Sequence, residues 1–516
     1  MARYNTSSAK TTNKVTNFEG GTSYKLNPKY ELISLMVSGL DNTFYEKLGD
    51  RETRFRDLIV NLAKTDLEFV AKALVYTRSV VGQRTVTHFG STVLAPFLSG
   101  TELGKRFYGK RDRNKKKGGI IYRLDDMLEI VACYMALNPN KPLPNSMKKG
   151  FKSALETSDA YELAKYQGKG KAVSLVDLVN LVHPKPSEDM VETFAKLMKG
   201  ELKQFNTVED KNTESGKVVA AKLKSGEITK QEAETELMEA KEGNYRDLIT
   251  SKKIGYLALL RNLRNILKNS SDGDLIDGAV GLLVDEKFIR KSLVFPHQID
   301  LALEVILEEF STSNTSARKV ITALNTAYEL SIPNLTELFT HGRTAVVFDT
   351  SASMTTKVTL AGSRKNGSDS RLGKAALVAA TLAKGINADV FHFASYCESV
   401  KFNPLDSVNT IKKNFVKLEG RVGHGTDFNS IFTTLKGNYD RVFVISDMQG
   451  ATYIKPSTYT NMHIYSIDMA GYGTSMFKPG HNIYSIYGYG ADIYELVKKV
   501  EIDPNVLIKE IEAIEI

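Results

Sequence analysis

The chain has few cysteines and no long hydrophobic run. Among its 516 residues only Cys133 and Cys397 are cysteines, and they lie far apart in apolar surroundings. They argue against a disulfide scaffold or a zinc site, and they indicate a reducing, cytoplasmic location. No apolar stretch approaches the roughly 18 residues needed to cross a bilayer, so no membrane association is expected. Residues 1–14 are polar and lack the apolar core of a signal peptide, which indicates a flexible arm.

Familiar sequence signatures of enzymes are also missing. The chain contains no Gly-x-Ser-x-Gly elbow and no plausible Cys and His pair. The stretch from Gly367 to Ala375 looks like a phosphate-binding loop, but it has five residues between its glycines instead of four, and Ala375 replaces the Ser or Thr that would hold Mg²⁺. Ser351 stands where a haloacid-dehalogenase phosphatase has its second Asp. We therefore expect a protein without catalysis of its own.

The length and charge of the chain set broad limits on its organisation. A chain of 516 residues is too long for one ordinary core and predicts at least two domains. With 42% apolar and 25% charged residues, the composition is that of a globular protein. The formal net charge is +9. The distribution of this charge along the chain is more informative than its size.

Most of the excess positive charge lies in a basic run at residues 104–118. The run holds eight Lys and Arg residues against the single acid Asp112. It includes Lys115, Lys116 and Lys117. Phe107 and Tyr108 lie inside the run, so it is suited to holding a phosphate backbone while the rings stack on bases. A solvated surface loop would carry the same pattern.

The first two thirds of the chain predict a helical repeat domain. Apolar residues recur at helical spacing in segments of about 10 to 16 residues separated by short Gly, Pro or Asn breaks. These segments cover residues 30–40, 67–75, 124–137, 146–155, 174–182, 191–198, 254–267, 299–310 and 317–330. Stacked antiparallel helix pairs fit this pattern, although no clean sequence period is visible. Residues 227–242 are polar on all sides, which predicts an exposed helical insertion.

A second pattern begins near Thr344. Apolar strands at residues 345–348, 389–393, 442–445 and 462–467 alternate with helical segments at 372–384, 406–415, 428–435 and 493–500. This alternation predicts a doubly wound, mainly parallel α/β sheet. The fold class expected is therefore an α-helical repeat domain followed by an α/β domain. The boundary lies at residues 333–341, giving an arm at 1–14, a helical domain at 15–340 and an α/β domain at 341–516.

Five oxygen-bearing residues follow or adjoin the strands of this second part. They are Asp349, Ser351, Ser353, Thr426 and Asp447. Because ligands of open α/β sheets bind at the carboxyl ends of the strands, these side chains are expected to converge there. Carboxylates and hydroxyls without Cys or His are the donors of a Mg²⁺ or Mn²⁺ centre. Helix capping by Ser351 and Ser353 is the simpler alternative, but it does not explain an Asp directly after a strand.

The same five residues resemble the metal-ion-dependent adhesion site of the von Willebrand factor A domain. In that family an Asp-x-Ser-x-Ser loop supplies the first ligands, a second loop supplies a Thr and a third supplies an Asp. All five positions are filled here in the family's order. The resemblance implies a bound Mg²⁺ or a similar divalent cation, and it implies a protein partner that docks on that metal.

Short segments in the helical part are similar in sequence and in order to the TROVE domain of Ro proteins. They lie at residues 19–24, 72–78, 165–171, 177–186, 255–266 and 295–299. Ro proteins also carry an adhesion-type domain at the C-terminus, so the resemblance covers nearly the whole chain. The basic run at 105–117 and the polar stretch at 207–245 have no counterpart that we can match.

This resemblance implies a ring of HEAT-like helical repeats closed by the adhesion-type domain. Ro proteins bind small noncoding Y RNAs on the outside of the ring, pass single-stranded RNA ends through its hole, and act in RNA surveillance or degradation. The implied partners are such RNAs and a protein, for example a ribonuclease, at the metal site. A monomer is expected.

Several basic residues in the matched segments are candidates for RNA contacts. They are Lys165, Lys169, Lys171, His183, Lys185, Arg261 and Arg264. The three lysines lie among glycines ahead of a helix for which Ser174 and Asp177 form a capping pair. Lys and His side chains contact phosphates and 2′-hydroxyls without reading sequence. Alternatively, His183 is a helix-terminal histidine and the two arginines are structural ion-pair partners.

Two other functions stay open on the sequence alone. The first is a metal-dependent protein-binding or adhesion module on a helical scaffold, for which RNA is incidental. The second is a metal-dependent hydrolase, because Asp427 and Asp447 lie near the candidate site although no obvious general base does.

Overall fold

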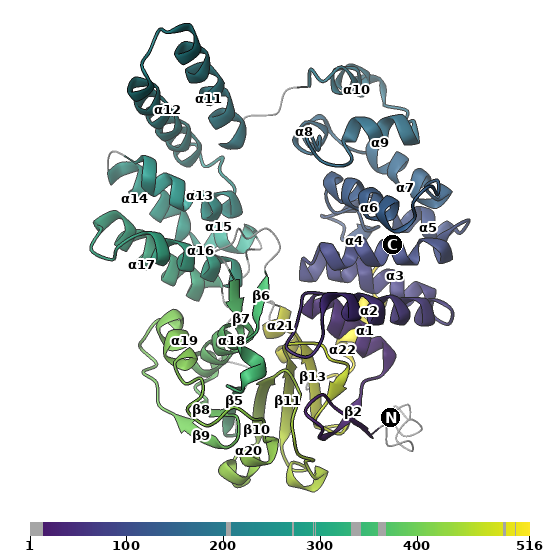
Figure 1. Cartoon of the computed structure of the whole chain (residues 1–516), viewed down its shortest axis with the longest axis vertical. Helices are drawn as coiled ribbons and strands as arrows, with labels where there is room; N and C mark the ends of the chain where they lie inside the picture. The colour runs from purple at the N-terminus through teal and green to yellow at the C-terminus, as the bar shows by residue number, and fades with distance from the viewer. Residues whose placement is uncertain are drawn as a thin grey trace.

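A computed structural model shows two helical arms that rise from an α/β part at the base of the molecule (Figure 1). It describes residues 14–202, 208–270, 273–292, 294, 296–331, 342–359, 368–488, 492–500 and 502–516. The expected combination of a helical part with an α/β part is confirmed. Residues 1–13 of the expected arm and residues 333–341 of the expected boundary lie outside the described residues.

The first arm is built from helices that stack one on the next. They are α1 (Pro28–Ser38), α2 (Leu48–Ala63), α3 (Leu67–Tyr76), α4 (Thr85–Leu98), α5 (Glu102–Phe107), α6 (Leu124–Leu137), α7 (Asn145–Glu156), α8 (Ala160–Lys165), α9 (Leu175–Val182) and α10 (Val191–Met198). Side chains cap the N-terminal ends of several of these helices. The Asp66 carboxylate accepts from the Phe69 amide at 3.1 Å, and Ser174 with Asp177 forms the expected capping box of α9.

The second arm continues in the same way on the other side of the molecule. Its helices are α11 (Val208–Ser225), α12 (Lys230–Thr250), α13 (Tyr256–Asn269), α14 (Gly273–Leu283), α15 (Glu286–Ser292), α16 (Pro296–Glu309) and α17 (Thr315–Ser331). Helices α11 and α12 pair at the tip of the arm (Figure 1). The polar segment 227–242 belongs to this pair, so its prediction as an exposed helix is confirmed. The end of α12 is different, because Tyr245, Leu248 and Ile249 are buried against α13 and α14.

The α/β part contains a six-stranded sheet in the order β13-β11-β10-β5-β8-β9. Its strands are β5 (Thr344–Asp349), β8 (Asp389–Phe393), β9 (Cys397–Val400), β10 (Arg441–Ser446), β11 (His463–Asp468) and β13 (Ile483–Tyr487). All neighbours pair in parallel except β8 and β9, which are antiparallel. The order in which the chain adds strands to the sheet reverses between β5 and β10, and open α/β sheets bind ligands at the carboxyl ends of the strands at such a point.

Helices cover both faces of this sheet, as the doubly wound prediction requires. Alternate residues of β5 belong to different cores: Val346 and Phe348 pack with α18 (Arg371–Ile386), and Ala345 and Val347 pack with α20 (Phe428–Leu435). Both sets are fully buried. Strands buried on both faces read as continuous apolar runs, which is why the sequence identified them.

Both ends of the chain attach the first arm to the α/β part. Strands β1 (Lys14–Thr16), β2 (Thr22–Lys25) and β12 (Thr474–Ser475) form a three-stranded sheet. At the other end, α21 (Asp492–Val500) leads to α22 (Val506–Glu512), which packs on α3. The Gly118 amide then donates to the Glu515 carbonyl at 2.9 Å, in the hairpin of β3 (Arg111–Asp112) and β4 (Lys117–Gly118).

The second arm rests on the opposite side of the α/β part. Lys412 on α19 (Val408–Val416) donates to Asp300 at 2.9 Å and to Glu304 at 2.5 Å, both on α16. The hydroxyls of Tyr328 and Thr381 lie 3.0 Å apart between α17 and α18. The α/β part therefore contacts both arms at the ends that lie nearest to it.

Candidate metal site and basic cavity

The five oxygen-bearing residues come from three loops at the carboxyl ends of β5 and β10. Asp349 is the last residue of β5, Asp447 directly follows β10, and Thr426 precedes α20. Two backbone bonds hold the loops together: the Ala352 amide donates to the His424 carbonyl at 3.1 Å, and the Ala451 amide donates to the Thr426 carbonyl at 2.9 Å. None of the five candidate ligands is more than 3% exposed. The structure thus brings the three loops into one buried site.

Hydrogen bonds orient the first carboxylate. Asp349 accepts from the Ser446 hydroxyl at 2.6 Å and from the Ser351 amide at 2.8 Å. The hydroxyls of Ser351 and Ser353 lie 3.2 Å apart. Ser351 precedes the 3-10 turn at Ala352–Thr355, but its side chain makes no capping hydrogen bond there. Helix capping therefore does not account for Ser351.

Burial makes the two carboxyl groups hard to ionise together. It raises the pKa of Asp349 to about 6. It also raises the pKa of Asp447 to about 8, and the negative charge of Asp349 adds to that shift. Two carboxylates close together in a water-poor site favour either a shared proton or a cation.

The donor set fits a hard divalent cation. Thr426 Oγ1 and Asp447 Oδ2 are buried without a hydrogen-bond partner, and a buried polar atom without a partner costs free energy. A Mg²⁺ ion coordinated by Asp349, Ser351, Ser353, Thr426 and Asp447 would satisfy these atoms and neutralise the carboxylates. No three His, Cys, Asp or Glu side chains gather at a metal-binding distance in the described part of the chain, so hydroxyls are essential to this site.

The structure adds residues around the site that the sequence did not identify. Ser446 was hidden as the last position of an apolar strand. Arg371, at the start of α18, is 2% exposed, and its Nε and Nη1 atoms lack hydrogen-bond partners. Its positive charge favours the ionised form of Asp447. Glu19 lies close enough that its charge disfavours ionisation of Asp349, and nothing in the sequence connects residues so far apart.

The N-terminal segment reaches the site through backbone contacts. The Asn17 amide group donates to the Gly450 carbonyl at 2.9 Å, and the Phe18 amide donates to Gln449 Oε1 at 2.9 Å. A Cβ atom on Gly21 would lie 2.1 Å from the Gly450 oxygen. Glycine is therefore required at position 21, which explains the Gly-Gly pair of the matched segment at 19–24.

A large basic cavity lies between the two arms. Its volume is about 1230 Å³, and residues from α8 and the loops beside it face residues from α12, α13 and α15. Its charged lining is strongly unbalanced, with seven cations against the acids Asp125 and Asp285. The cations are Arg123, Lys165, Lys171, Lys252, Lys253, Arg261 and Lys291. The cavity therefore brings together three of the predicted RNA contacts, Lys165, Lys171 and Arg261.

Aromatic rings line the same cavity. Tyr161, Tyr166, Tyr256 and Phe288 are among its lining residues. The Lys165 ammonium lies 5.1 Å from the centre of the Tyr161 ring and 5.6 Å from that of Tyr166. Cations interleaved with aromatic rings are suited to a single nucleic-acid strand.

The other predicted RNA contacts lie elsewhere. Lys169 is exposed on the loop after α8, and His183 ends α9 with a left-handed φ of 48°. Lys185 is exposed nearby, and its backbone amide donates to Glu156 at 2.7 Å. Arg264 forms an ion pair with Glu309 at 3.0 Å. A structural ion pair was the alternative to an RNA contact for this residue. None of these four lines the cavity.

The basic run at 104–118 is partly structural. The Arg111 guanidinium donates to the carbonyls of Gly118 and Lys116 at 2.8 and 2.6 Å, and Lys117 pairs with Glu515 at 3.1 Å. The prediction that Phe107 and Tyr108 stack on bases is wrong, because both are fully buried. Their rings pack in the arm, and the Tyr108 hydroxyl donates to the Ser91 carbonyl at 2.7 Å. Lys115, Lys116 and Lys117 remain exposed on the hairpin.

Comparison with known proteins finds a solved structure with a similar fold. No protein-family model matches the sequence, and no curated protein matches it either. The crystal structure of the Ro protein (RSR) of Deinococcus radiodurans matches with a TM-score of 0.56 and 14% sequence identity. The match covers 92% of this chain and 99% of that chain, so the two share a fold over nearly their whole lengths.

Within the described residues, no helix is both long and apolar enough to span a membrane.

Proposed function

We propose that this chain is a Ro-type RNA-binding protein without catalysis of its own. It would be the protein component of a ribonucleoprotein that binds small noncoding, Y-like RNA and single-stranded ends of structured or misfolded RNA, for surveillance or degradation in the cytoplasm. Its helical part would be a TROVE-like ring of HEAT-like repeats, and its α/β part a von Willebrand factor A-like domain. The shared fold with the Ro protein supports this assignment.

The basic cavity is the observation that carries the proposal. Seven cations and four aromatic rings face one space of about 1230 Å³, with only two acids. A phosphate backbone would neutralise the cations and release their counterions, and the rings of the exposed Tyr161 and the half-buried Tyr166 would stack on bases. A folded protein partner would not need such a one-sided charge.

Removal of cavity charge tests the proposal. The variant Lys165→Ala/Lys171→Ala/Arg261→Ala removes three cations that line the cavity, and Lys115→Ala/Lys116→Ala/Lys117→Ala removes three from the hairpin outside it. In a gel-shift titration with single-stranded RNA, the first variant should bind at least about tenfold more weakly than the second. Equal affinities for the two variants would contradict binding in the cavity.

The candidate metal site supports a second activity on the same chain. Its unpartnered Thr426 and Asp447 oxygens favour a bound Mg²⁺, and the ion would offer a further coordination position to a carboxylate of a protein partner, such as a ribonuclease. The alternative function is a metal-dependent adhesion module for which RNA is incidental.

Chelation separates these two functions. Under the RNA-binding proposal, Asp349→Ala and EDTA should leave RNA binding in the cavity intact while any metal-dependent protein partner is lost in a pull-down. Loss of all RNA binding in Asp349→Ala, with the fold retained by circular dichroism, would show that the metal site rather than the cavity holds the RNA.

A further inference from the structure

Four aromatic rings form a cluster beside the candidate metal site. The aromatic cluster consists of Phe18, Phe44, Tyr45 and Tyr472. The rings of Phe18 and Tyr45 stack with an angle of 4° between their planes and 5.4 Å between their centres. Tyr45 also meets Phe44 and Tyr472 edge to face, at 4.9 and 5.6 Å. Contributions from three separate parts of the chain thus build one aromatic surface.

Two rings of this cluster are left open to solvent. Phe18 is 51% exposed and Phe44 is 54% exposed, whereas Tyr472 is 5% exposed. Exposing apolar rings to water is unfavourable. Phe18 and Phe44 both contact Tyr45, and exposed rings gathered in this way mark a binding surface more often than an isolated exposed ring does.

Hydrogen bonds fix Phe18 and the ring of Tyr45 before any ligand arrives. The Phe18 amide donates to Gln449, and Asn17 Oδ1 accepts from the amides of Glu19 and Gly21 at 3.1 and 3.0 Å. The Tyr45 hydroxyl donates to Glu19. A preorganised surface loses little conformational entropy on binding, which favours affinity.

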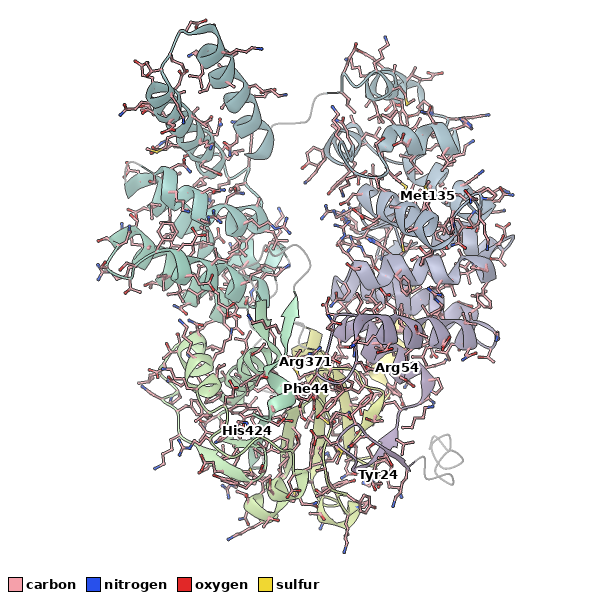
Figure 2. The ribbon with its side chains drawn as sticks, viewed as in Figure 1. Tyr24, Phe44, Arg54, Met135, Arg371 and His424 are labelled. Carbon is pink, nitrogen blue, oxygen red and sulfur yellow. The ribbon has the colours of Figure 1, made fainter. Side chains whose placement is uncertain are left out.

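The cluster adjoins the metal site electrostatically as well as through the chain. The charge of Asp447 disfavours ionisation of both Tyr45 and Tyr472. Burial raises the pKa of Asp41, in the loop that carries Phe44, and the positive charge of Arg371 opposes that rise. Figure 2 shows Phe44 and Arg371 where the α/β part meets the helical arms. A ligand on the exposed rings would therefore lie next to the carboxyl ends of β5 and β10.

We propose that the aromatic cluster stacks on a base of the single-stranded RNA that the protein binds. The inference rests on the proposed function and names a second point of contact for the same RNA. Flat exposed rings accept any base, because every base has a π face. The basic cavity supplies the affinity for the phosphate backbone, and the cluster holds one or two bases outside that cavity.

Fluorescent RNA tests the stacking directly. Single-stranded RNA of about 20 nucleotides with 2-aminopurine at one end or the other is titrated with the full chain, because stacking on an aromatic ring quenches this base. The variant Phe18→Ala/Phe44→Ala removes the two exposed rings, and Phe18→Tyr/Phe44→Tyr keeps aromatic faces. Leu405→Ala/Ile502→Ala, at positions 89% and 87% exposed, is the control for losing exposed apolar side chains elsewhere.

If the cluster stacks on a base, the wild type, the tyrosine variant and the control should all quench the fluorescence. The alanine variant should not quench it, and its affinity for RNA should be about tenfold lower. Unchanged quenching and affinity in the alanine variant would overturn it, and would leave a protein partner as the occupant of the rings. In that case RNA binding by the wild type still supports the proposed function. Absence of RNA binding by every form, with Mg²⁺ present, would refute both.

Discussion

Asp447 is the residue on which the chemistry of the α/β part depends most. It is fully buried, its Oδ2 atom has no hydrogen-bond partner, and the neighbouring charge of Asp349 opposes its ionisation. A natural protein keeps such a costly group where a ligand will compensate it. A divalent cation between the two aspartates is the compensation that the surrounding hydroxyls suit.

The first prediction concerns a variant that lacks this carboxylate. In the absence of metal at pH 8, Asp447→Asn should unfold at the same temperature as the wild type or a higher one, because a buried negative charge is lost. Addition of Mg²⁺ should raise the melting temperature of the wild type but not of the variant. Asp389→Asn, at the opposite end of the sheet, is the control and should respond to Mg²⁺ like the wild type. A Mg²⁺ response of Asp447→Asn equal to that of the wild type would contradict the site.

The second prediction concerns pH. A carboxyl group has an ordinary pKa of about 4, and burial raises the pKa of Asp349 to about 6 and of Asp447 to about 8. These two groups therefore contribute stability below about pH 4 that the metal-free protein loses as pH rises through 6 and 8. A cation replaces the protons, so the Mg²⁺-induced rise in melting temperature should be larger at pH 8 than at pH 5.5. An equal rise at both pH values would argue against binding by these carboxylates.

Asp126 shows the opposite solution to burying a charge. Burial alone would raise the pKa of its carboxyl group, but the hydrogen bond from His88 and the charges of Arg78 and Arg84 hold that pKa well below the ordinary range. Its oxygens also accept from the Tyr122 and Arg123 amides at 3.1 and 2.9 Å. This cluster joins α4 and α6, which gives His88 a structural role.

The third prediction follows from that cluster. Asp126→Asn should lower the free energy of unfolding by about 3–5 kcal/mol, because it leaves the buried Arg78 without its counterion. Asp177→Asn, in the exposed capping box of α9, should cost only about 1 kcal/mol. Urea unfolding followed by circular dichroism measures both. Equal and small costs would show that the Asp126 cluster does not stabilise the first arm.

Ion pairs at the foot of the second arm connect helices of the two structural parts. Lys412 of α19 is 4% exposed and Asp300 of α16 is 1% exposed, and Lys374 of α18 lies 3.8 Å from the same carboxylate. Buried pairs of this kind fix the register of two elements as well as adding stability.

The fourth prediction tests this connection. Lys412→Met should destabilise the protein by about 3 kcal/mol and speed amide hydrogen exchange in α16 more than in the first arm. Lys413→Met, which changes the exposed neighbouring lysine, should have little effect. Unchanged exchange in α16 would mean that the connection does not hold the arm in place.

The elements that could be predicted from the sequence are those with an unambiguous pattern. Strands β5 and β10 were identified because both faces are buried and their sequences are continuously apolar. Helix α4 was missed because it contains Gly90 and Pro96, which are poor helix formers. A Cβ atom at position 90 would lie 2.6 Å from Leu74 Cδ2, so a larger residue there would have to displace that buried side chain. Which residue is tolerated at such a position depends on how the helices pack against one another. The local spacing of apolar residues does not reveal that packing.

The functional residues divide in the same way. Asp349, Thr426 and Asp447 could be located because each adjoins a strand or a glycine-rich turn of recognisable type. Phe18 and Glu19 could not, because they reach the site only after β2 pairs with β12. Arg371 could not, because it comes from a separate element, the start of α18. Phe107 and Tyr108 were misjudged for a related reason, since a basic neighbourhood in sequence says little about which side of a helix is buried.

At the scale of the whole molecule, the α/β part holds the feet of two arms and leaves a basic cavity between them. Cations of α8 and of the loops beside it line the same cavity as cations of α13, α15 and the loop that follows α12, and the two sets belong to different arms (Figure 1). The architecture therefore brings separate basic positions together around one space. The candidate metal site lies in the α/β part, and the aromatic cluster joins Phe44 and Tyr45 of the first arm to Tyr472 of the α/β part.

The central claim, that the cavity binds RNA through its cations, is tested most directly by the salt dependence of binding. The measurement is the fluorescence anisotropy of a labelled single-stranded RNA, titrated between about 50 and 200 mM salt. The logarithm of the association constant should fall linearly with the logarithm of salt concentration. Removing Lys165, Lys171 and Arg261 should make that slope shallower by about 2, at about 0.7 for each lost contact. A slope that is flat in the wild type, or the same in the cavity variant as in the wild type, would contradict the account.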